Sequence, residues 1–483
     1  MILNTYILKK NYIFPLPFIL TICFIVYSCD KMINGNLRSF SKKLEKSIIS
    51  YKAVIPSIVV FRGKSEKVVE NCSQIHISSN ISLLYLNGWQ KLDSNFHVFA
   101  YSAYADKRIE DNAFIRILAV CKETPEVFCR IWQNDTESYV IKAEVKEMWI
   151  NSWDFARKGR YYQPILVSCP LSSSSLPIAV SLVSKPCTEP RNIFKIHLDD
   201  IDKKQNFAIC LKPLYFNEDV YHRLLEWLEL QFILGADVVN IYAYKLHPKI
   251  WNAINSYSES GKVIVKNFSL PVDTYEMLLR QDKTMERLWQ KRRYEMIVYN
   301  DCFYKHIHSH KYVINLDLDE AIVPKFHNSW VHLLENASLE NPNLKRSASI
   351  SVANVYFFDS FGSVTDNAIP VYMHMLRHIY RSANFTPPGF AQKSFFSTDY
   401  SSIVSNHYTI RTIRTGIRMI STIDKKLAQL HHYRVSCPPL MEEDCKKNYM
   451  KYKRKDPTLW KFKDILIKNV KKKIRDLNSI EDS

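Results

Sequence analysis

Asp317 and Asp319 form an Asp-x-Asp pair directly after the apolar run at 312–316. Two residues apart, their side chains would point to the same side of an extended strand. Paired carboxylates suit a hard divalent cation, which can neutralise the charge of a leaving diphosphate. A solvated acidic turn is the simpler alternative. Glu320 would point to the opposite face of such a strand, and we expect it to be structural.

The residues before this pair are patterned as the nucleotide-binding half of an α/β domain. Apolar runs alternate with segments of helical spacing, and Gly235 is placed to end the first helix. This alternation predicts a parallel sheet with right-handed crossovers, a Rossmann-like arrangement. Ligands bind outside the carboxyl ends of strands in such sheets. The expected strands are 207–211, 238–242, 262–265 and 311–317, and the expected helices are 219–234, 247–258 and 277–304.

A smaller β-rich subdomain is expected ahead of this α/β region, over residues 81–200. Short apolar runs at 96–100, 114–120 and 163–167 alternate with turn residues. The fold class is therefore α/β, with a mostly parallel sheet and a β-rich N-terminal subdomain.

Residues 12–29 form an uncharged, mostly apolar stretch near the start of the chain. Its length is just sufficient for a transmembrane helix. A cleaved signal peptide is the alternative, but the small-x-small cleavage pattern is absent. We expect an uncleaved signal-anchor in the lipid bilayer, with residues 1–11 as a cytoplasmic tail and residues 30–80 as a stem.

The composition favours a globular protein, and the glycosylation sequons favour the secretory pathway. Only 9 glycines and 24% charged residues argue against a disordered or fibrous chain. The net charge of +18 is compatible with an anionic partner or with a solvated basic surface. No nucleic-acid-binding signature accompanies the charge, so nucleic acid is not an expected partner. Glycosylation sequons occur at Asn71, Asn80, Asn134, Asn267, Asn336 and Asn384.

The cysteines indicate an oxidising compartment. Nine of the 11 cysteines lie outside the apolar N-terminal stretch, an odd number that predicts at least one free or intermolecular thiol. Cys121 and Cys129 are close enough in sequence for a local disulfide, as are Cys437 and Cys445.

Several short motifs in sequence order make the chain resemble glycosyltransferase family 92. Asp-x-Asp alone also occurs in haloacid-dehalogenase-like phosphatases, but there it lies early in the Rossmann domain and is followed by small residues and Thr. Here the joint pattern over residues 160–440 is more specific. The matching pieces are Val167–Pro170, Phe207–Tyr215, Glu226–Glu229, Asn300-Asp301-Cys302, Val313–Glu320, Lys393-Ser394 and His432-Tyr433-Arg434.

The resemblance implies a GT-A fold over residues 201–445 and inverting transfer of a hexose from a UDP-sugar. Galactose is the expected sugar, Mn²⁺ or another divalent cation the expected cofactor, and a glycan, sometimes fucose-bearing, the expected acceptor. Carried over by position, Asp317, Asp319 and His432 would hold the metal, with His407 as the alternative histidine. The implied location is the Golgi membrane, as a single-pass type II protein.

Further roles follow from the same resemblance. Inversion requires a carboxylate base for the acceptor hydroxyl, and Asp359 is preferred over Asp366 and Asp399. Asp301, Asp317, Lys393 and Arg434 are expected to contact the donor. The family often carries Gln and Ala shortly before Asn-Asp-Cys, where this chain has Glu295 and Val298. The departure leaves donor and acceptor identity open.

The basic C-terminal segment 446–483 contains an amphipathic helix at 458–477. We expect its apolar stripe to pack on the catalytic domain, with contact to an anionic membrane as the alternative. For the whole chain, the second hypothesis is a catalytically inactive, membrane-tethered glycan-binding or scaffold protein on the same fold.

Overall fold

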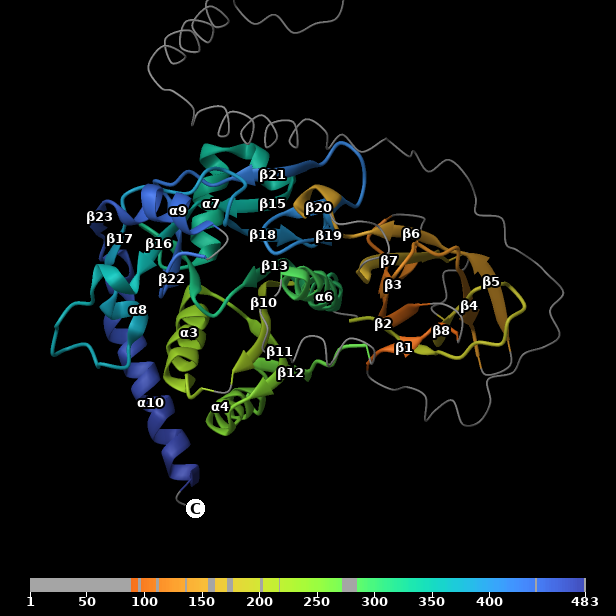
Figure 1. The fold of residues 1–483 in the computed structure, drawn as a ribbon, viewed down its shortest axis with the longest axis horizontal. Coiled ribbons are helices and arrows are strands. Elements are labelled where there is room, and N and C mark those ends of the chain that lie inside the picture. Colours follow the sequence, from red (N-terminus) through yellow and green to blue (C-terminus); the bar gives the residue numbers. More distant parts are fainter. Residues whose placement is uncertain are drawn as a thin grey trace, which may run out of the picture. The chain divides into compact units, whose positions relative to one another are not determined.

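The computed structural model describes residues 88–93, 97–109, 113–134, 137–154, 161–171, 177–199, 203–216, 218–271, 285–438 and 441–481 (Figure 1). The described residues belong to one compact unit. The predicted tail, signal-anchor and stem at 1–11, 12–29 and 30–80 lie outside the described residues. Within the described ranges, no helix is both long and apolar enough to cross a membrane.

A seven-stranded sheet in the order β12-β11-β10-β13-β18-β15-β21 is the centre of the α/β region. The pairings of β10 with β11 and β13, of β11 with β12 and of β15 with β21 are parallel, whereas those of β18 are antiparallel. The predicted mixed α/β fold with a mostly parallel sheet is thus confirmed. Its strands are β10 (Gln205–Phe216), β11 (Val238–Leu246), β12 (Val263–Asn267), β13 (His310–Leu316), β15 (Ser347–Val352), β18 (Lys393–Ser397) and β21 (Arg418–Thr422).

The strand order reverses between β10 and β13. After β10 the chain steps outward to β11 and β12, and then returns to place β13 on the other side of β10, with Cys210 paired to Asn315. The carboxyl ends of β10 and β13 therefore lie side by side. Such a reversal is where open α/β sheets bind ligands.

Helices cover both faces of this sheet. Phe207, Ile209 and Leu211 share one buried core with helices α3, α4, α7 and α10, while Ala208 and Cys210 share another with α6. This alternation is the two-residue period of a strand buried on both faces. The helices are α3 (Tyr221–Leu234), α4 (Pro248–Ser258), α6 (Met285–Lys305), α7 (Trp330–Glu340), α8 (His374–Arg377), α9 (Glu442–Cys445) and α10 (Lys463–Glu481).

The first of these helices ends where the sequence predicts. Gly235 adopts φ +116°, a left-handed conformation that glycine adopts with little strain, and its N–H bonds to the carbonyls of Gln231 and Phe232. The helix begins at Tyr221, and the Asp219 side chain accepts a hydrogen bond from the Tyr221 N–H at 3.3 Å. The part of the expected helix 277–304 that precedes residue 285 lies outside the described residues.

A small three-stranded sheet, β14-β22-β16, lies beside the central one. β14 and β22 are antiparallel with Glu320 opposite His432, and β16 and β22 are parallel with Tyr356 opposite His432. This sheet carries His432 to the residues that follow β13. The strands are β14 (Glu320–Pro324), β16 (Asn354–Phe358) and β22 (Ala428–Arg434), and two further pairs are β17 (Tyr380–Ser382) with β23 (Lys453–Lys455) and β19 (Ser401–Val404) with β20 (Thr409–Thr412).

The residues before β10 form a largely antiparallel sheet, β5-β4-β8-β9-β2-β3-β7-β6, with β1 paired to β2. The region is β-rich, as its sequence predicts. Its strands are β1 (Gln90–Lys91), β2 (Val98–Asp106), β3 (Phe114–Cys121), β4 (Phe128–Trp132), β5 (Ser138–Lys142), β6 (Glu144–Glu147), β7 (Gln163–Pro170), β8 (Ala179–Val183) and β9 (Phe194–His197).

The disulfides confirm one predicted pair and correct another. Cys437 is bonded to Cys445, as expected. Cys129 is bonded to Cys169 rather than to Cys121, which is a buried free thiol. The Cys121–Cys129 prediction was wrong because it weighed closeness in sequence alone. Cys210 and Cys302, far apart in sequence, join β10 to α6.

The C-terminal helix packs on the α/β region, beside α3 (Figure 1). The predicted helix 458–477 is a 3₁₀ helix at Thr458–Phe462 followed by α10 at Lys463–Glu481. The stripe residues Leu459 and Phe462 of the first and Leu466 and Val470 of the second are all at most 3% exposed and belong to the same core as the central sheet. The expectation that this stripe packs on the protein is confirmed.

Candidate functional site

A cavity of about 320 Å³ opens where β10 and β13 end. Residues that follow β13 form one wall, and the carboxyl-terminal part of β10 forms another. The rest comes from α3, α8 and β22. The lining residues are Lys212, Pro213, Leu214, Val220, Arg223, Glu226, Asp317, Leu318, Asp319, His374, Met375 and Tyr433.

Asp317, Leu318 and Asp319 form a turn rather than the end of an extended strand, since β13 ends at Leu316 and β14 begins at Glu320. The Asp317 N–H donates to Glu320 Oε2 at 2.9 Å, and the Tyr433 N–H donates to the Asp319 carbonyl at 2.8 Å. The prediction that Glu320 points away from the pair was therefore wrong. Its buried carboxylate lies within the same cluster and organises the turn.

Lys393 is the buried cation at the centre of this cluster. Its Nζ lies 3.1 Å from Asp317 Oδ1, 2.9 Å from Glu320 Oε2 and 2.5 Å from Asn406 Oδ1, and its side chain is 0% exposed. Burial lowers the pKa of a lysine, but Asp317 and Glu320 outweigh it and raise the pKa of Lys393. The ammonium group is therefore held charged between two carboxylates.

Lys212 approaches Asp317 from β10. Its Nζ lies 3.5 Å from Asp317 Oδ2 and 3.8 Å from Glu295 Oε1. Burial would raise the pKa of Asp317, but Lys212 and Lys393 together hold it well below its ordinary value. Glu295, one of the two positions that depart from the family pattern, thus contributes to the charge around the site.

The His432 imidazole lies between the carboxylates of Asp319 and Glu320. Its Nε2 is 3.5 Å from Asp319 Oδ2, and its Nδ1 is 3.4 Å from Glu320 Oε1 and 3.2 Å from Asn354 Oδ1. Burial lowers the pKa of this imidazole, but Glu320 and Asp319 more than offset it and raise the pKa. The structure thus brings His432 to Asp319.

Asp319 and His432 fit the ligand set of a divalent cation. The Asp319 side chain is 45% exposed at the cavity, and the 3.5 Å between Oδ2 and Nε2 can be spanned by an ion with bonds of about 2.1 Å. Both oxygens of Asp317 face ammonium groups instead, so it fits as a neighbour of such an ion. Among the described residues, three side chains whose possible metal-ligand atoms already lie close together are found elsewhere, at Asp359, His374 and His378.

The other histidine and arginine candidates lie nearby. His407 is oriented by a 2.8 Å hydrogen bond from its Nδ1 to the Gln392 carbonyl, and burial lowers its pKa to about 3. Its imidazole interacts electrostatically with Lys393 and Asp317, but it is not among the residues that line the cavity. Arg434 Nη1 lies 3.4 Å from His432 Nε2.

Asp301 is not brought to this site. Its buried carboxylate accepts hydrogen bonds from Ser102 Oγ at 2.5 Å, Tyr104 OH at 2.7 Å and Tyr242 OH at 2.7 Å, and Lys266 Nζ lies 3.3 Å away. Ser102 and Tyr104 belong to β2 of the N-terminal sheet. Asp301 therefore joins that sheet to the α/β region. We do not include Asp301 among the residues proposed to contact the sugar donor.

The rest of the Asn-Asp-Cys motif is also structural. Asn300 donates to the carbonyls of Met296 and Val404 and accepts from the Val404 N–H. Cys302 is bonded to Cys210. This motif thus anchors α6 to its neighbours, at a distance from the cavity.

The three candidate bases occupy different places. Asp399 pairs with Lys204, and Ser397 is opposite Tyr312 near the start of β13, so Asp399 lies at the end of that strand away from Asp317. Asp366 lies 3.7 Å from Lys463. Asp359 follows β16 and points at His374, a residue of the cavity wall, but does not line the cavity itself.

Sequence reasoning missed Lys212, Glu226 and His374 in the cavity wall. Lys212 could have been found, because it lies at the carboxyl end of the strand next to β13. Glu226 accepts hydrogen bonds from the N–H groups of Met375 and Leu376, at 3.0 and 3.1 Å, and burial raises its pKa to about 7. It fixes the start of α8, a long-range contact that the sequence does not signal.

The comparisons with known proteins agree with this arrangement. The model of glycosyltransferase family 92 matches residues 205–475, which include both sheets of the site. Over 261 residues the chain is 22% identical to glycosyltransferase family 92 protein F13G3.3 of Caenorhabditis elegans, covering 52% of this chain and 48% of that protein. It is also 22% identical over 277 residues to beta-1,4-galactosyltransferase galt-1 of the same nematode, covering 53% and 59%.

The chain thus spans about half the length of the curated relatives that it matches. The family match itself covers more than half of the 483 residues. It contains the strands that carry Lys212, Lys393 and His432 and the turn that carries Asp317 and Asp319. The chain belongs to glycosyltransferase family 92.

Proposed function

We propose that this glycosyltransferase transfers a hexose, with galactose as the first candidate, from a UDP-sugar to a glycan acceptor with inversion, on a GT-A fold and with a divalent cation. The observation that carries the proposal is the turn Asp317-Leu318-Asp319 at the β10/β13 reversal, facing a cavity of about 320 Å³. Clefts of this size suit small-molecule ligands. Galactose is chosen because one relative is named a beta-1,4-galactosyltransferase.

The placement of Asp319 supports a cation requirement. Glu295, Asp317 and Glu320 lie beside the ammonium groups of Lys212 and Lys393. The Asp319 side chain faces His432 instead and is 45% exposed. A diphosphate that approached Asp319 would be repelled by this exposed carboxylate, and a divalent cation between Asp319 and His432 would remove that repulsion.

Asp319 and His432 would hold Mn²⁺ or a similar ion, with Asp317 beside it. When bound, such an ion neutralises charge on the departing diphosphate. The chain's own residues prepare this place. Lys393 and Lys212 keep Asp317 ionised, Glu320 fixes the turn through the Asp317 N–H, and Tyr433 fixes Asp319 through its carbonyl.

Lys212 and Arg434 are the cations best placed to meet the donor. Lys212 lines the cavity and its side chain is 33% exposed, so its ammonium group can reach a ligand. Arg434 adjoins His432 at the rim of the same cluster. Lys393 is fully buried and acts through Asp317 rather than by direct contact.

The proposed setting is the Golgi lumen, with residues 12–29 as a type II signal-anchor. The support is the apolar N-terminal stretch, the disulfide-bonded core and the glycosylation sequons. In such a setting a glycan acceptor on a glycoprotein or glycolipid is at hand.

A donor scan tests the proposal. The purified full chain would be given a panel of UDP-hexoses with a glycan array as acceptor, with Mn²⁺ or with EDTA. We expect transfer from UDP-galactose that requires the cation. Binding of glycans without any turnover of any donor would favour the alternative, an inactive glycan-binding protein on this fold.

A further inference from the structure

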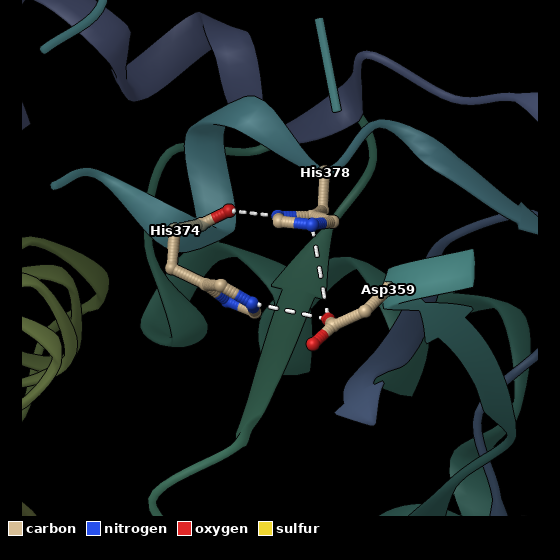
Figure 2. Close-up of side chains that lie close together, drawn as sticks. All are labelled: Asp359, His374 and His378. Carbon is tan, nitrogen blue, oxygen red and sulfur yellow. Dashed lines mark hydrogen bonds and ion pairs between the residues drawn. The ribbon is translucent and has the colours of Figure 1, made fainter. Parts of the chain in front are cut away.

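We infer that Asp359, His374 and His378 form a second metal site, suited to Zn²⁺, separate from the Asp319–His432 pair. His374 Nε2 lies 3.2 Å and His378 Nε2 lies 3.7 Å from the same oxygen, Oδ1 of Asp359. Figure 2 shows both imidazoles directed at this carboxylate. One ligand atom from each of the three residues lies within 4.8 Å of the others.

The two spacings between an imidazole nitrogen and the carboxylate match a tetrahedral ion, and the two nitrogens lie within 4.8 Å of each other. Zinc bonds to histidine nitrogen and carboxylate oxygen measure about 2.0–2.2 Å, so neighbouring ligands of a tetrahedral site lie about 3.3–3.6 Å apart. The two nitrogen–oxygen distances of 3.2 and 3.7 Å bracket that range. Two nitrogens and one oxygen are a ligand set that zinc accepts, with a fourth position left open.

The backbone orients His378 for this role. Its Nδ1 lies 2.7 Å from the His374 carbonyl oxygen, which can only accept, so Nδ1 carries the proton (Figure 2). The lone pair of a neutral His378 is then on Nε2, facing Asp359. A histidine that donates its other N–H to a backbone carbonyl is the usual arrangement at metal sites.

The two imidazole rings lie close together, with centroids 4.1 Å apart, and both place Nε2 on the side of Asp359. A cation between Nε2 of His378 and the carboxylate would remove the contact between two electron-rich atoms.

The three ligands come from elements that the fold holds in place. Asp359 directly follows β16, and His374 and His378 are four residues apart, at the start and just beyond the end of α8. The buried Glu226 carboxylate binds the N–H groups of Met375 and Leu376 and so fixes the helix turn between them. The ligands need little rearrangement to meet an ion.

Access to the site is from a second cavity of about 310 Å³, which His374 and His378 line. Their side chains are 15% and 14% exposed, and that of Asp359 is 31% exposed. His374 also lines the first cavity, beside Asp317 and Asp319. Zinc bound here would fix the wall shared by the two cavities. The inference stands on these contacts and does not depend on glycosyl transfer.

Cobalt substitution tests the site in the full chain. Chelator-treated protein would be titrated with Co²⁺ and followed by its visible d–d bands, which are intense only in tetrahedral sites. We expect one equivalent of tetrahedral Co²⁺ that Zn²⁺ displaces. His378→Gln and Asp359→Asn should each remove this band or weaken Co²⁺ binding by at least about tenfold.

Two controls separate this site from its neighbours. His222→Ala changes a histidine that lines the same cavity but is outside the ligand group, and Asp319→Asn changes the first cluster. Both variants should keep the tetrahedral band. The inference is overturned if wild-type protein shows no such band, or if the band survives in the His378 and Asp359 variants. Should either variant fail to fold, a thermal shift of the wild type by Zn²⁺ decides: no rise in Tm rejects the site.

Discussion

Oδ2 of Asp319 lies 3.5 Å from Nε2 of His432, although one residue follows β13 and the other lies in β22. The pairing of Glu320 with His432 between β14 and β22 brings them together. The turn and the small sheet thus create a nitrogen–oxygen pair at the reversal point of the large sheet. The proposed activity depends on this pair.

Lys393→Met should destabilise the protein strongly. It keeps the side-chain volume but leaves Asp317 and Glu320 without their buried cation. Removing one partner of a buried ion pair costs about 3–5 kcal/mol. Denaturant unfolding would measure the loss. Lys426→Met is the matched control, because its pair with Glu340 is exposed and screened by solvent, so its loss should hardly change the stability. Equal effects of the two changes would refute the central role of Lys393.

Glu226 should make stability depend on pH. Its folded-state pKa of about 7 is above the ordinary value of 4.5. Its contribution is therefore fully present below pH 4.5 and is lost as the pH rises from 4.5 through 7, by on the order of 3 kcal/mol. Unfolding free energies of wild type and Glu226→Gln, measured across pH 4.5–8, should diverge in slope. If the two plots of unfolding free energy against pH were parallel, burial would not raise the pKa of Glu226. A constant difference in stability between the two proteins, caused by the amide itself, does not affect this comparison.

Asp301→Asn should lower stability and spare donor binding. The amide cannot accept from Ser102, Tyr104 and Tyr242 as the carboxylate does. Leaving such buried donors unsatisfied costs about 2–4 kcal/mol. Thermal unfolding would show the loss, and the KM for donor in the folded protein should remain that of the wild type. A raised KM at unchanged stability would restore the donor-contact prediction.

Leu466→Ala should show that α10 is part of the core. The Leu466 side chain is fully buried, and such truncations cost about 2–5 kcal/mol. Ile465, its neighbour on the same helix, is 50% exposed and provides the control, with an effect of about 0.5 kcal/mol or less. Chemical denaturation compares the two. A small loss of stability for Leu466→Ala would mean that α10 does not pack against this core in solution.

Local patterns in the sequence predicted much of the fold. The strands β10, β11 and β13 and the helices α3 and α4 each have a clear period, and Gly235 has the conformational freedom that its position requires. The acidic pair was also predicted to follow a strand. These features depend on neighbours in sequence, so a single chain is enough to find them.

The remainder depends on pairing between distant residues. The turn at Asp317 is set by Glu320 and by Tyr433 of β22, and the Cys129–Cys169 bond is set by strands far apart in sequence. His432 was reached only through the family resemblance. The contact of His374 and His378 with Asp359 requires β16 and α8 to meet, which no periodic pattern indicates.

The most direct test of the central claim is the rate of UDP release from UDP-galactose by Asp319→Asn in the presence of Mn²⁺. Asp424→Asn, an exposed carboxylate of the same type, is the control. We predict that wild type and Asp424→Asn turn over the donor only with the cation. Asp319→Asn should lose at least about a hundredfold in rate, since it removes a group that holds the neutralising charge. A wild-type rate for Asp319→Asn would contradict the account.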